Sequence, residues 1–416
     1  MSELLAIETA QQRILAALRP IGSEPCRVED CAGRVLAEDI TSPLALPPFD
    51  NSSMDGFCLR AADIAAASAA APVVLPVSAD IPAGAGLPAP LPAGSAARIL
   101  TGAPLPPGTD AVLPVENTDQ YGRPGQTLPQ MVACFAPVKA GENVRRKGED
   151  LQQGQRVLKK GRTLQAQDVG LLVALGFAQV AVMRRPRIAV FSSGDELLTP
   201  GQPLAPGKIY DANRYVLGAL LQDAGAEVLQ LGIAQDTRAS VEALLQNAVA
   251  QAPDLILSSA GVSVGVYDFV RQVLEENGAL DFWRVNMRPG KPVAFGQYRG
   301  IPFLGLPGNP VSAYIGCLVF VLPLLRALLG QPAAAPRKVQ ATLQEPLQSP
   351  DGRESFYRGI LTRSGEQTVA RLAGHQGSGN LFSLVQANAL LIVPAGVKSI
   401  AAGETVTAWL LDEEIA

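Results

Sequence analysis

The sequence predicts a multi-domain protein of the α/β plus β class, on three observations. The chain has 416 residues, whereas a single hydrophobic core usually stops growing near ~250 residues. Residues from about 41 to 140 form short apolar runs cut by proline and glycine, as in a β-rich domain. From about 180 to 330, apolar strands alternate with helical segments, which indicates a parallel α/β layer.

Two helices are expected outside that layer. Glu8 to Leu18 has apolar residues at helical spacing before Pro20, and a second helical period runs from Gln165 to Phe177. The first segment lacks the cationic start and continuous apolar core of a signal peptide. The alanine-rich stretch Ala65 to Pro72 is either a linker or the end of a surface helix.

The α/β layer and the C-terminal part can be divided into individual elements. The strands expected in the layer are Ile188–Phe191, Val228–Gly232, Leu255–Leu257, Val293–Phe295 and Pro302–Leu304. Its helices are expected at Asn213–Ala224, Arg238–Ala250, Phe269–Glu276 and Pro310–Leu329. The last helix is strongly apolar but contains Pro323 and Arg326, which favours a buried helix or a subunit interface over a membrane span. Short alternating runs then predict a small β-barrel or sandwich, with strands at Val339–Leu343, Ser355–Ile360, Thr368–Leu372, Ala389–Val393 and Glu404–Leu411.

Composition limits the chemistry. The chain has 34 Lys and Arg residues and 38 acidic residues, which gives a net charge of −4. Nucleic acid is therefore not an expected partner. The five cysteines form no CxxC pair, and we expect reduced thiols in a cytoplasmic protein. With His375 as the single histidine, a multi-histidine metal site is excluded. Any chemistry is therefore expected to depend on carboxylates, hydroxyls, cations and backbone groups.

Ligands of an open α/β sheet bind where strands end and helices begin. After the first strand, Ser192 to Glu196 combines small residues with two acids that could reach Mg²⁺, although a solvated helix cap is an equal alternative. After the second strand, Asp236 is a natural N-cap for the helix near Arg238, and the local pattern favours that interpretation.

The third strand leads into a hydroxyl- and glycine-rich loop. This loop, from Ser258 to Gly265, precedes Asp268 and could present N–H groups to a phosphate. It has neither the Gly-Lys-Ser/Thr ending of a Walker A loop nor a GxGxxG pattern, so a mononucleotide P-loop is disfavoured.

Cations and a rigid turn follow further along the chain. Arg284, Arg288 and Lys291 surround a Pro-Gly pair, a setting that favours anion capture over plain surface charge. The turn from Gly305 to Pro310 places Asn309 at an N-cap and proline at the first helical position, facing an anion.

Nine segments in this order resemble the MoeA family of molybdopterin molybdenumtransferases, whose eukaryotic relatives include the gephyrin E domain. The segments are DNSSMDGF (50–57), LTGAPLPPGTDAV (100–112), RRKGEDL (145–151), SSGDEL (192–197), KIYDANR (208–214), SAGVSVGVYD (259–268), FWRVNMRPGKP (282–292), GLPGNPVSA (305–313) and GRESFYR (352–358).

The resemblance implies an L-shaped subunit of four regions. They are a discontinuous N-terminal linking region at 1–44 and 146–179, an inserted β-rich domain at 45–145, a three-layer α/β domain like molybdopterin-binding proteins at 180–330, and a C-terminal β-barrel at 336–416. It further implies a homodimer whose active site is shared between subunits.

The implied reaction belongs to molybdenum cofactor biosynthesis. Family members take adenylylated molybdopterin and molybdate and, with Mg²⁺, insert the metal while the pyrophosphate bond is cleaved and AMP leaves. Contact with the molybdopterin adenylyltransferase is an expected partnership; a membrane partner is not. The alternatives are a molybdopterin adenylyltransferase, which shares the α/β domain, and a non-catalytic scaffold of the same fold.

Site residues are carried over by position. The implied catalytic residues are Asp55, Thr101, Glu196, Asp236 and Asp268, with Glu196 and Asp268 as the acids for Mg²⁺. Taken locally, the turns that hold Asp55 and Thr101 would be ordinary Asx-turn chemistry. The implied substrate-binding residues are Arg145, Asp150, Ser193, Gly261, Ser263, Arg284, Arg288, Lys291, Pro307, Gly308, Asn309, Pro310, Ser312 and Arg353.

The sequence departs from the family pattern in two places. Ala260 stands where Gly-Gly is usual, and we expect it to have φ below zero, because alanine in the left-handed region is costly. Arg284 and Arg288 stand where lysines are common, which keeps the charge but changes its geometry. His375 lies outside every acid cluster and is assigned no catalytic role.

Overall fold

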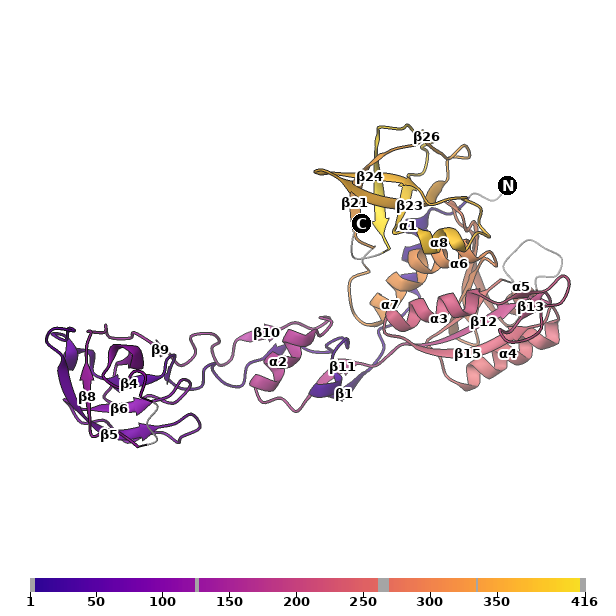
Figure 1. Ribbon diagram of the computed structural model, residues 1–416. Coiled ribbons are helices and arrows are strands. Elements are labelled where there is room, and N and C mark those ends of the chain that lie inside the picture. Colours follow the sequence, from indigo (N-terminus) through magenta and orange to yellow (C-terminus); the bar gives the residue numbers. More distant parts are fainter. Residues whose placement is uncertain (1–3, 124–126, 261–268, 334–335, 412–416) are drawn as a thin grey trace.

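The computed structural model describes residues 4–123, 127–260, 269–333 and 336–411 (Figure 1). A small β-rich region lies at one end and is joined by a narrow linking region to a larger body. In that body the C-terminal barrel stands over the α/β region, at an angle to the long arm. This outline is the L-shape that the sequence implied.

The α/β region is built on a six-stranded sheet of order β15-β12-β16-β20-β19-β17. Its first four strands are parallel, as the predicted α/β layer requires, but β19 pairs antiparallel with both neighbours, so the sheet is mixed. The reason is a two-residue hairpin of Arg299 and Gly300, both at positive φ, which reverses the chain. The strands are β12 Arg187–Ser193, β15 Glu227–Ala234, β16 Leu255–Ser259, β17 Gly278–Arg284, β19 Pro292–Tyr298 and β20 Ile301–Leu306.

Helices cover both faces of this sheet and complete three layers. On β12, Ile188 and Val190 face one core, while Ala189 and Phe191 face the other. Burial on both faces explains why these strands read as continuous apolar runs. The helices are α3 Asn213–Asp223, α4 Arg238–Ala250, α5 Phe269–Asn277, α6 Pro310–Gly316 and α7 Leu322–Leu328. Two short strands, β13 Leu197–Leu198 and β14 Ile209–Tyr210, pair with each other in parallel.

A π-helical segment, Cys317–Val321, joins α6 to α7. The wider turn just precedes Pro323, which cannot donate to the helix ladder. Within the described residues, 310–328 is the one helix whose length and hydropathy would let it cross a membrane, and 78% of it is buried inside the protein. That burial is typical of a core helix.

The first helix, α1 (Ile7–Ala16), lies against the body. Ile7, Ala10 and Ile14 belong to the same core as α7, and Leu5 N–H donates to the carbonyl of Arg284. The chain then enters the linking region, made of β1 Ser23–Arg27, η1 Val28–Asp30, β2 Ile40–Thr41, β10 Arg156–Leu158, α2 Ala166–Ala174 and β11 Gln179–Met183.

The inserted region carries a five-stranded sheet of order β7-β4-β6-β5-β8, with a separate core on each face. A 3₁₀ turn, η2, ends at Ile64, just before the alanine-rich stretch. The elements are β3 Asn51–Ser52, β4 Gly56–Leu59, η2 Ala61–Ile64, β5 Val73–Ile81, β6 Ala96–Ile99, β7 Ala111–Pro114, η3 Val115–Asn117, β8 Met131–Cys134 and β9 Val144–Arg145.

The C-terminal region is a closed barrel, because β23 pairs with both β24 and β25 at the ends of the order β23-β24-β21-β27-β25. Strand β18 (Met287–Arg288) of the α/β region runs parallel to the start of β23 and ties the two regions together. The barrel elements are β21 Lys338–Leu343, β22 Leu347–Gln348, β23 Glu354–Ser364, β24 Gln367–Leu372, α8 Phe382–Gln386, β25 Ala389–Val393, β26 Ser399–Ile400 and β27 Thr405–Leu410.

Candidate active site

Acidic residues gather where β12 and β15 end. The Asp236 carboxylate accepts hydrogen bonds from Ser193 Oγ at 3.2 Å and from the Asp195 N–H at 3.3 Å. In return, the Asp236 N–H donates to Asp195 Oδ1 at 3.1 Å. Asp236 is therefore not the N-cap that the sequence suggested: Thr237 caps α4 through the Ser240 N–H. The prediction placed the N-cap one residue too early, because Asp and Thr are both favourable N-cap residues.

Glu196 lies next to this group. Its carboxylate folds back over Gly194, where an added Cβ would come within 2.5 Å of Glu196 Oε2. Any side chain at position 194 would have to displace the Glu196 carboxylate from this place. The β13–β14 pairing holds the segment, with the Ile209 N–H bonded to the Glu196 carbonyl at 2.8 Å.

Glu196 is on the wall of an α/β-edge cavity of about 560 Å³, a size within the usual range for a small-molecule site. Most of its other walls come from β14, the start of α3, the residue after β16 and the Gly305–Pro310 turn. The lining residues are Glu196, Leu197, Ile209, Tyr210, Asp211, Ala212, Asn213, Ala260, Pro292, Pro307, Gly308, Asn309, Pro310 and Gly379.

A second, cationic pocket of about 390 Å³ lies between the α/β region and the barrel. Because β18 pairs with β23, residues 67 apart in the sequence become strand neighbours, with Met287 opposite Glu354 and Arg288 opposite Ser355. The pocket brings together four of the predicted anion-binding residues, Arg288, Lys291, Ser312 and Arg353. Arg284, the fifth predicted residue of this kind, is not among the residues that line it.

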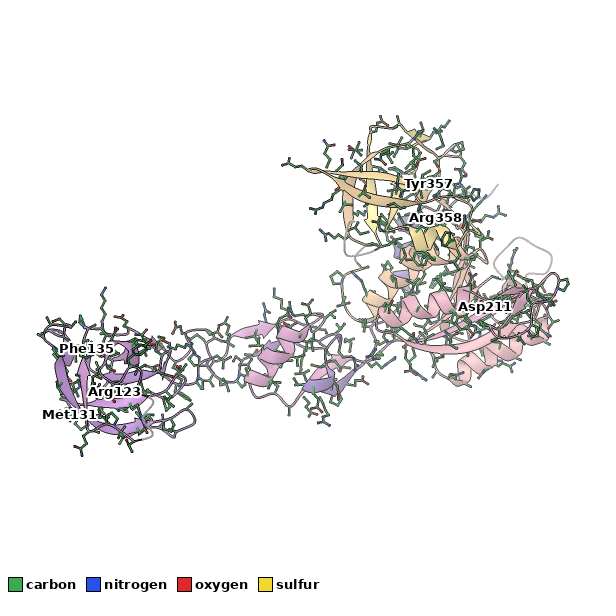
Figure 2. All side chains as sticks on the ribbon, in the orientation of Figure 1. Arg123, Met131, Phe135, Asp211, Tyr357 and Arg358 are labelled. Carbon is green, nitrogen blue, oxygen red and sulfur yellow. The ribbon has the colours of Figure 1, made fainter. Side chains whose placement is uncertain are left out.

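Arg358, which is labelled in Figure 2, completes the positive charge of this pocket and was not predicted from the sequence. The side chain is only 1% exposed, and its Nε donates to Ser383 Oγ at 3.0 Å. Its Nη2 donates to the carbonyls of His375 at 3.1 Å and Gly377 at 3.0 Å. All of these acceptors are neutral, whereas Arg353 is paired with Asp351. The available signal was a second arginine in GRESFYR, five residues after Arg353.

The start of α6 belongs to both hollows. Pro310 is the first residue of the helix and Asn309 its N-cap, as predicted, but the Asn309 side chain accepts no hydrogen bond from the helix and its amide donates to Ser378 Oγ at 3.0 Å. The Val311 N–H donates to the Ser378 carbonyl at 3.1 Å. Pro307 and Asn309 line both the cationic pocket and the α/β-edge cavity. The Pro307-Gly308-Asn309 turn is therefore a wall shared by the two.

The inserted-region residues lie elsewhere. Thr101 N–H and Oγ1 both donate to Asp55 Oδ1, each at 2.7 Å, and these bonds lower the pKa of the Asp55 carboxyl. In Figure 1 this region is at the far end of the arm from the α/β body. Asp55, Thr101, Arg145 and Asp150 are therefore not brought to the α/β edge within one chain. Gly261, Ser263 and Asp268 lie outside the described residues.

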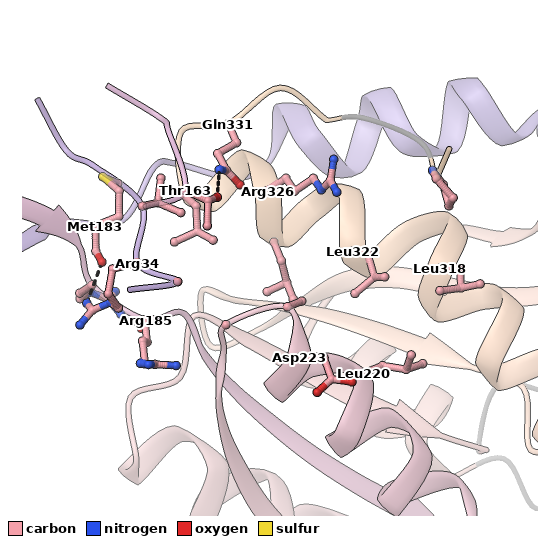
Figure 3. Close-up of a pocket in the computed structure, with 18 of the residues that line it drawn as sticks. Arg34, Thr163, Met183, Arg185, Leu220, Asp223, Leu318, Leu322, Arg326 and Gln331 are labelled. Carbon is pink, nitrogen blue, oxygen red and sulfur yellow. Dashed lines mark hydrogen bonds between the residues drawn. The ribbon is translucent and has the colours of Figure 1, made fainter. Parts of the chain in front are cut away.

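A larger cavity of about 600 Å³ lies away from all these groups (Figure 3). It has an apolar floor that includes Leu220, Leu318 and Leu322, with Arg185 and Arg326 among its walls. None of the predicted site residues lines it, so size alone does not mark the reactive site.

Three known protein families match successive parts of the chain. Residues 5–176 match the MoeA N-terminal region (domain I and II), 189–327 a probable molybdopterin binding domain, and 340–411 the MoeA C-terminal region (domain IV). The chain belongs to the MoeA family.

Individual relatives agree along nearly the whole length. "Molybdopterin molybdenumtransferase 2" of Mycobacterium tuberculosis is 39% identical over 96% of this chain and 98% of that protein. "Molybdopterin molybdenumtransferase" of Haemophilus influenzae is 37% identical over 97% of this chain and 98% of that protein. The solved structure of a molybdopterin biosynthesis MoeA protein from Pyrococcus horikoshii superposes with a TM-score of 0.84 at 33% identity, covering 99% of this chain and 100% of that one.

Proposed function

We propose that this chain is a molybdopterin molybdenumtransferase of molybdenum cofactor biosynthesis, which inserts molybdate into adenylylated molybdopterin and releases AMP. The observation that carries the proposal is the shared wall between the cationic pocket and the α/β-edge cavity. Molybdate is a tetrahedral dianion, and charge-assisted hydrogen bonds from Arg288, Lys291 and Arg358 suit it. The neighbouring cavity then takes the nucleotide-bearing pterin, so that the two substrates meet at the turn.

The acids suit the phosphate side of the reaction. Asp236 and Ser193 form one hydrogen-bonded unit, and Glu196 lines the cavity. Among the residues that the structure describes, no three acidic, histidine or cysteine side chains are grouped to hold a metal ion. Mg²⁺ commonly binds through one or two carboxylates together with substrate phosphates, and Glu196 suits that mode. Asp268, which lies outside the described residues, is the second acid that we propose. When bound, Mg²⁺ would neutralise phosphoryl charge.

Thiol chemistry is not part of this proposal. All five cysteines are buried and unpaired, and burial raises the pKa of Cys58 and Cys317 to about 12. Unpaired thiols also support a cytoplasmic location. We propose that a molybdopterin adenylyltransferase makes the adenylylated pterin that this chain uses, since the activated pterin must be formed before it reacts.

The direct test is AMP release. Purified protein incubated with adenylylated molybdopterin, molybdate and Mg²⁺ should release AMP, and a matched reaction without molybdate should release far less. No AMP in the complete reaction contradicts the proposal. Consumption of ATP with free molybdopterin would instead identify an adenylyltransferase. If cofactor synthesis in cells stays normal with Asp268→Ala, the chain is a scaffold.

We further propose a homodimer in which Asp55 and Thr101 of one subunit complete the site of the other, because these residues lie far from Glu196 within one chain. Heterodimers of Asp55→Ala and Glu196→Ala subunits, purified through two different tags, test this. In a shared site one of the two sites is fully wild type, so about half of the wild-type activity is expected. Activity no higher than that of either single variant refutes sharing.

A further inference from the structure

We infer that Asn213 is a positioning residue for metal insertion, acting through the turn that separates the two substrate hollows; this rests on the proposed function. Asn213 is the first residue of α3 and is 9% exposed. Its Nδ2 donates to Ser259 Oγ at 2.7 Å and to the Gly308 carbonyl at 2.7 Å. One amide group therefore ties the end of β16 to the shared wall.

The start of α3 is a rigid base for that amide. Asp211 is 2% exposed and accepts from Ser192 Oγ at 2.9 Å and from Arg214 Nε at 3.1 Å. Arg214 Nη1 in turn donates to Gln230 Oε1 at 3.1 Å. Buried charged groups tied in this way have little freedom to move. Asn213 thus projects from a helix end that is bonded to both β12 and β15.

The contact with Gly308 fixes the orientation of a peptide plane. In a trans peptide the carbonyl and the following N–H point in opposite directions. Holding the Gly308 carbonyl toward Asn213 therefore turns the Asn309 N–H away from Asn213. Asn309 lines both hollows, so this contact sets the shape of the wall between the substrates.

A misplaced wall should affect the reaction more than binding. The cations of the molybdate pocket are not bonded to Asn213, so molybdate should still bind when the amide is removed. Reacting groups held about 1 Å out of place can lose about 100-fold in rate. We expect Asn213→Ala to lower kcat for AMP release about 10- to 100-fold, with both KM values changed by no more than about threefold.

Two further variants separate positioning from simple loss of stability. Asn213→Asp can still accept from the Ser259 hydroxyl but cannot donate to Gly308, so its kcat should fall as far as that of Asn213→Ala. Asn388→Ala is the matched control, because Asn388 also makes two hydrogen bonds, to the Leu361 N–H and carbonyl, but in the barrel. It should lose stability and keep the wild-type kcat.

Hydrogen–deuterium exchange gives a readout that does not need turnover. The peptide covering residues 305–310 should exchange faster in Asn213→Ala than in wild type or in Asn388→Ala. Unchanged exchange there, or a kcat within twofold of wild type in active preparations, overturns the inference. Failure of the wild-type protein to release AMP would count against the proposed function, while the exchange comparison would still decide the role of Asn213.

Discussion

The buried guanidinium of Arg358 gives the most direct quantitative test of the cationic pocket. Its hydrogen-bond partners are a hydroxyl and two carbonyls, none of which carries charge. Burial lowers the pKa of Arg358 from its ordinary value to about 10. It stays charged at neutral pH, at a desolvation cost of about 3 kcal/mol, taking about 1.4 kcal/mol per pH unit.

A bound dianion should offset part of the desolvation free energy of the Arg358 guanidinium. We expect Arg358→Met, which keeps a long apolar side chain, to weaken molybdate binding by about 10- to 100-fold, or about 1.4–2.7 kcal/mol. Arg363→Met is the matched control, because Arg363 lies on the same strand with an exposed side chain. The pH dependence follows from the charged form: since the folded-state pKa is lowered, molybdate affinity should fall as the pH rises through about 10.

Isothermal titration calorimetry with molybdate measures this effect, with sulfate as a competing dianion. Thermal unfolding gives a second readout, because a ligand at 100 times its Kd adds about 2.7 kcal/mol to stability. The wild type and Arg363→Met should gain this stabilisation, whereas Arg358→Met, with a 10- to 100-fold higher Kd, should gain only about 0.4–1.4 kcal/mol at the same molybdate concentration. If Arg358→Met binds molybdate within twofold of Arg363→Met, Arg358 supports the barrel and does not hold the anion.

Three further outcomes are expected. Lys291→Ala should raise the molybdate concentration needed for half-maximal AMP release more than it raises the KM for the pterin; equal molybdate dependence in variant and wild type discards that assignment. Thr101→Val removes one of two donors that lower the Asp55 pKa, so the acidic limb of the pH–rate profile should move to higher pH. An unmoved limb means that Asp55 does not govern it. Burial, with the nearby Glu8, raises the pKa of Glu354, so ionised Glu354 costs stability above its folded-state pKa. Glu354→Gln should therefore raise the unfolding temperature at pH 7, with the gain shrinking as the pH falls into the carboxyl range; a gain independent of pH contradicts this.

The α/β elements were predictable because their burial leaves a plain trace in the sequence. Strand β12 is buried on both faces and reads as a continuous apolar run, and α3 and α4 begin where the helical period predicts. The reversed direction of β19 was not predicted. Its direction depends on a two-residue turn, Arg299-Gly300, in which arginine adopts a positive φ that its type rarely shows.

The cationic pocket was predicted only in part, for a different reason. Arg288, Lys291 and Arg353 could be named because each lies in a motif, but their meeting depends on the register between β18 and β23. A shift of one residue would turn Arg358 to the other face of its strand. Nothing local signals that register, and an arginine at 1% exposure is uncommon enough that sequence reasoning places it on the surface.

Ala260 shows how a wrong expectation can follow from a correct rule. Its φ is 76°, in the left-handed region, where alanine costs about 1 kcal/mol or more. The sheet supplies the compensation: the Ala260 N–H donates to the Leu306 carbonyl at 3.0 Å, which extends the pairing of β16 with β20 by one residue. Gly308 leaves room for the Ala260 side chain, because a Cβ at position 308 would lie 3.1 Å from the Ala260 Cβ. Glycine at position 260 would remove the strain of the positive φ, but it would also give the backbone at this position more conformational freedom. Alanine instead restricts the backbone at the end of β16, beside the same Gly308 whose carbonyl accepts a hydrogen bond from Asn213.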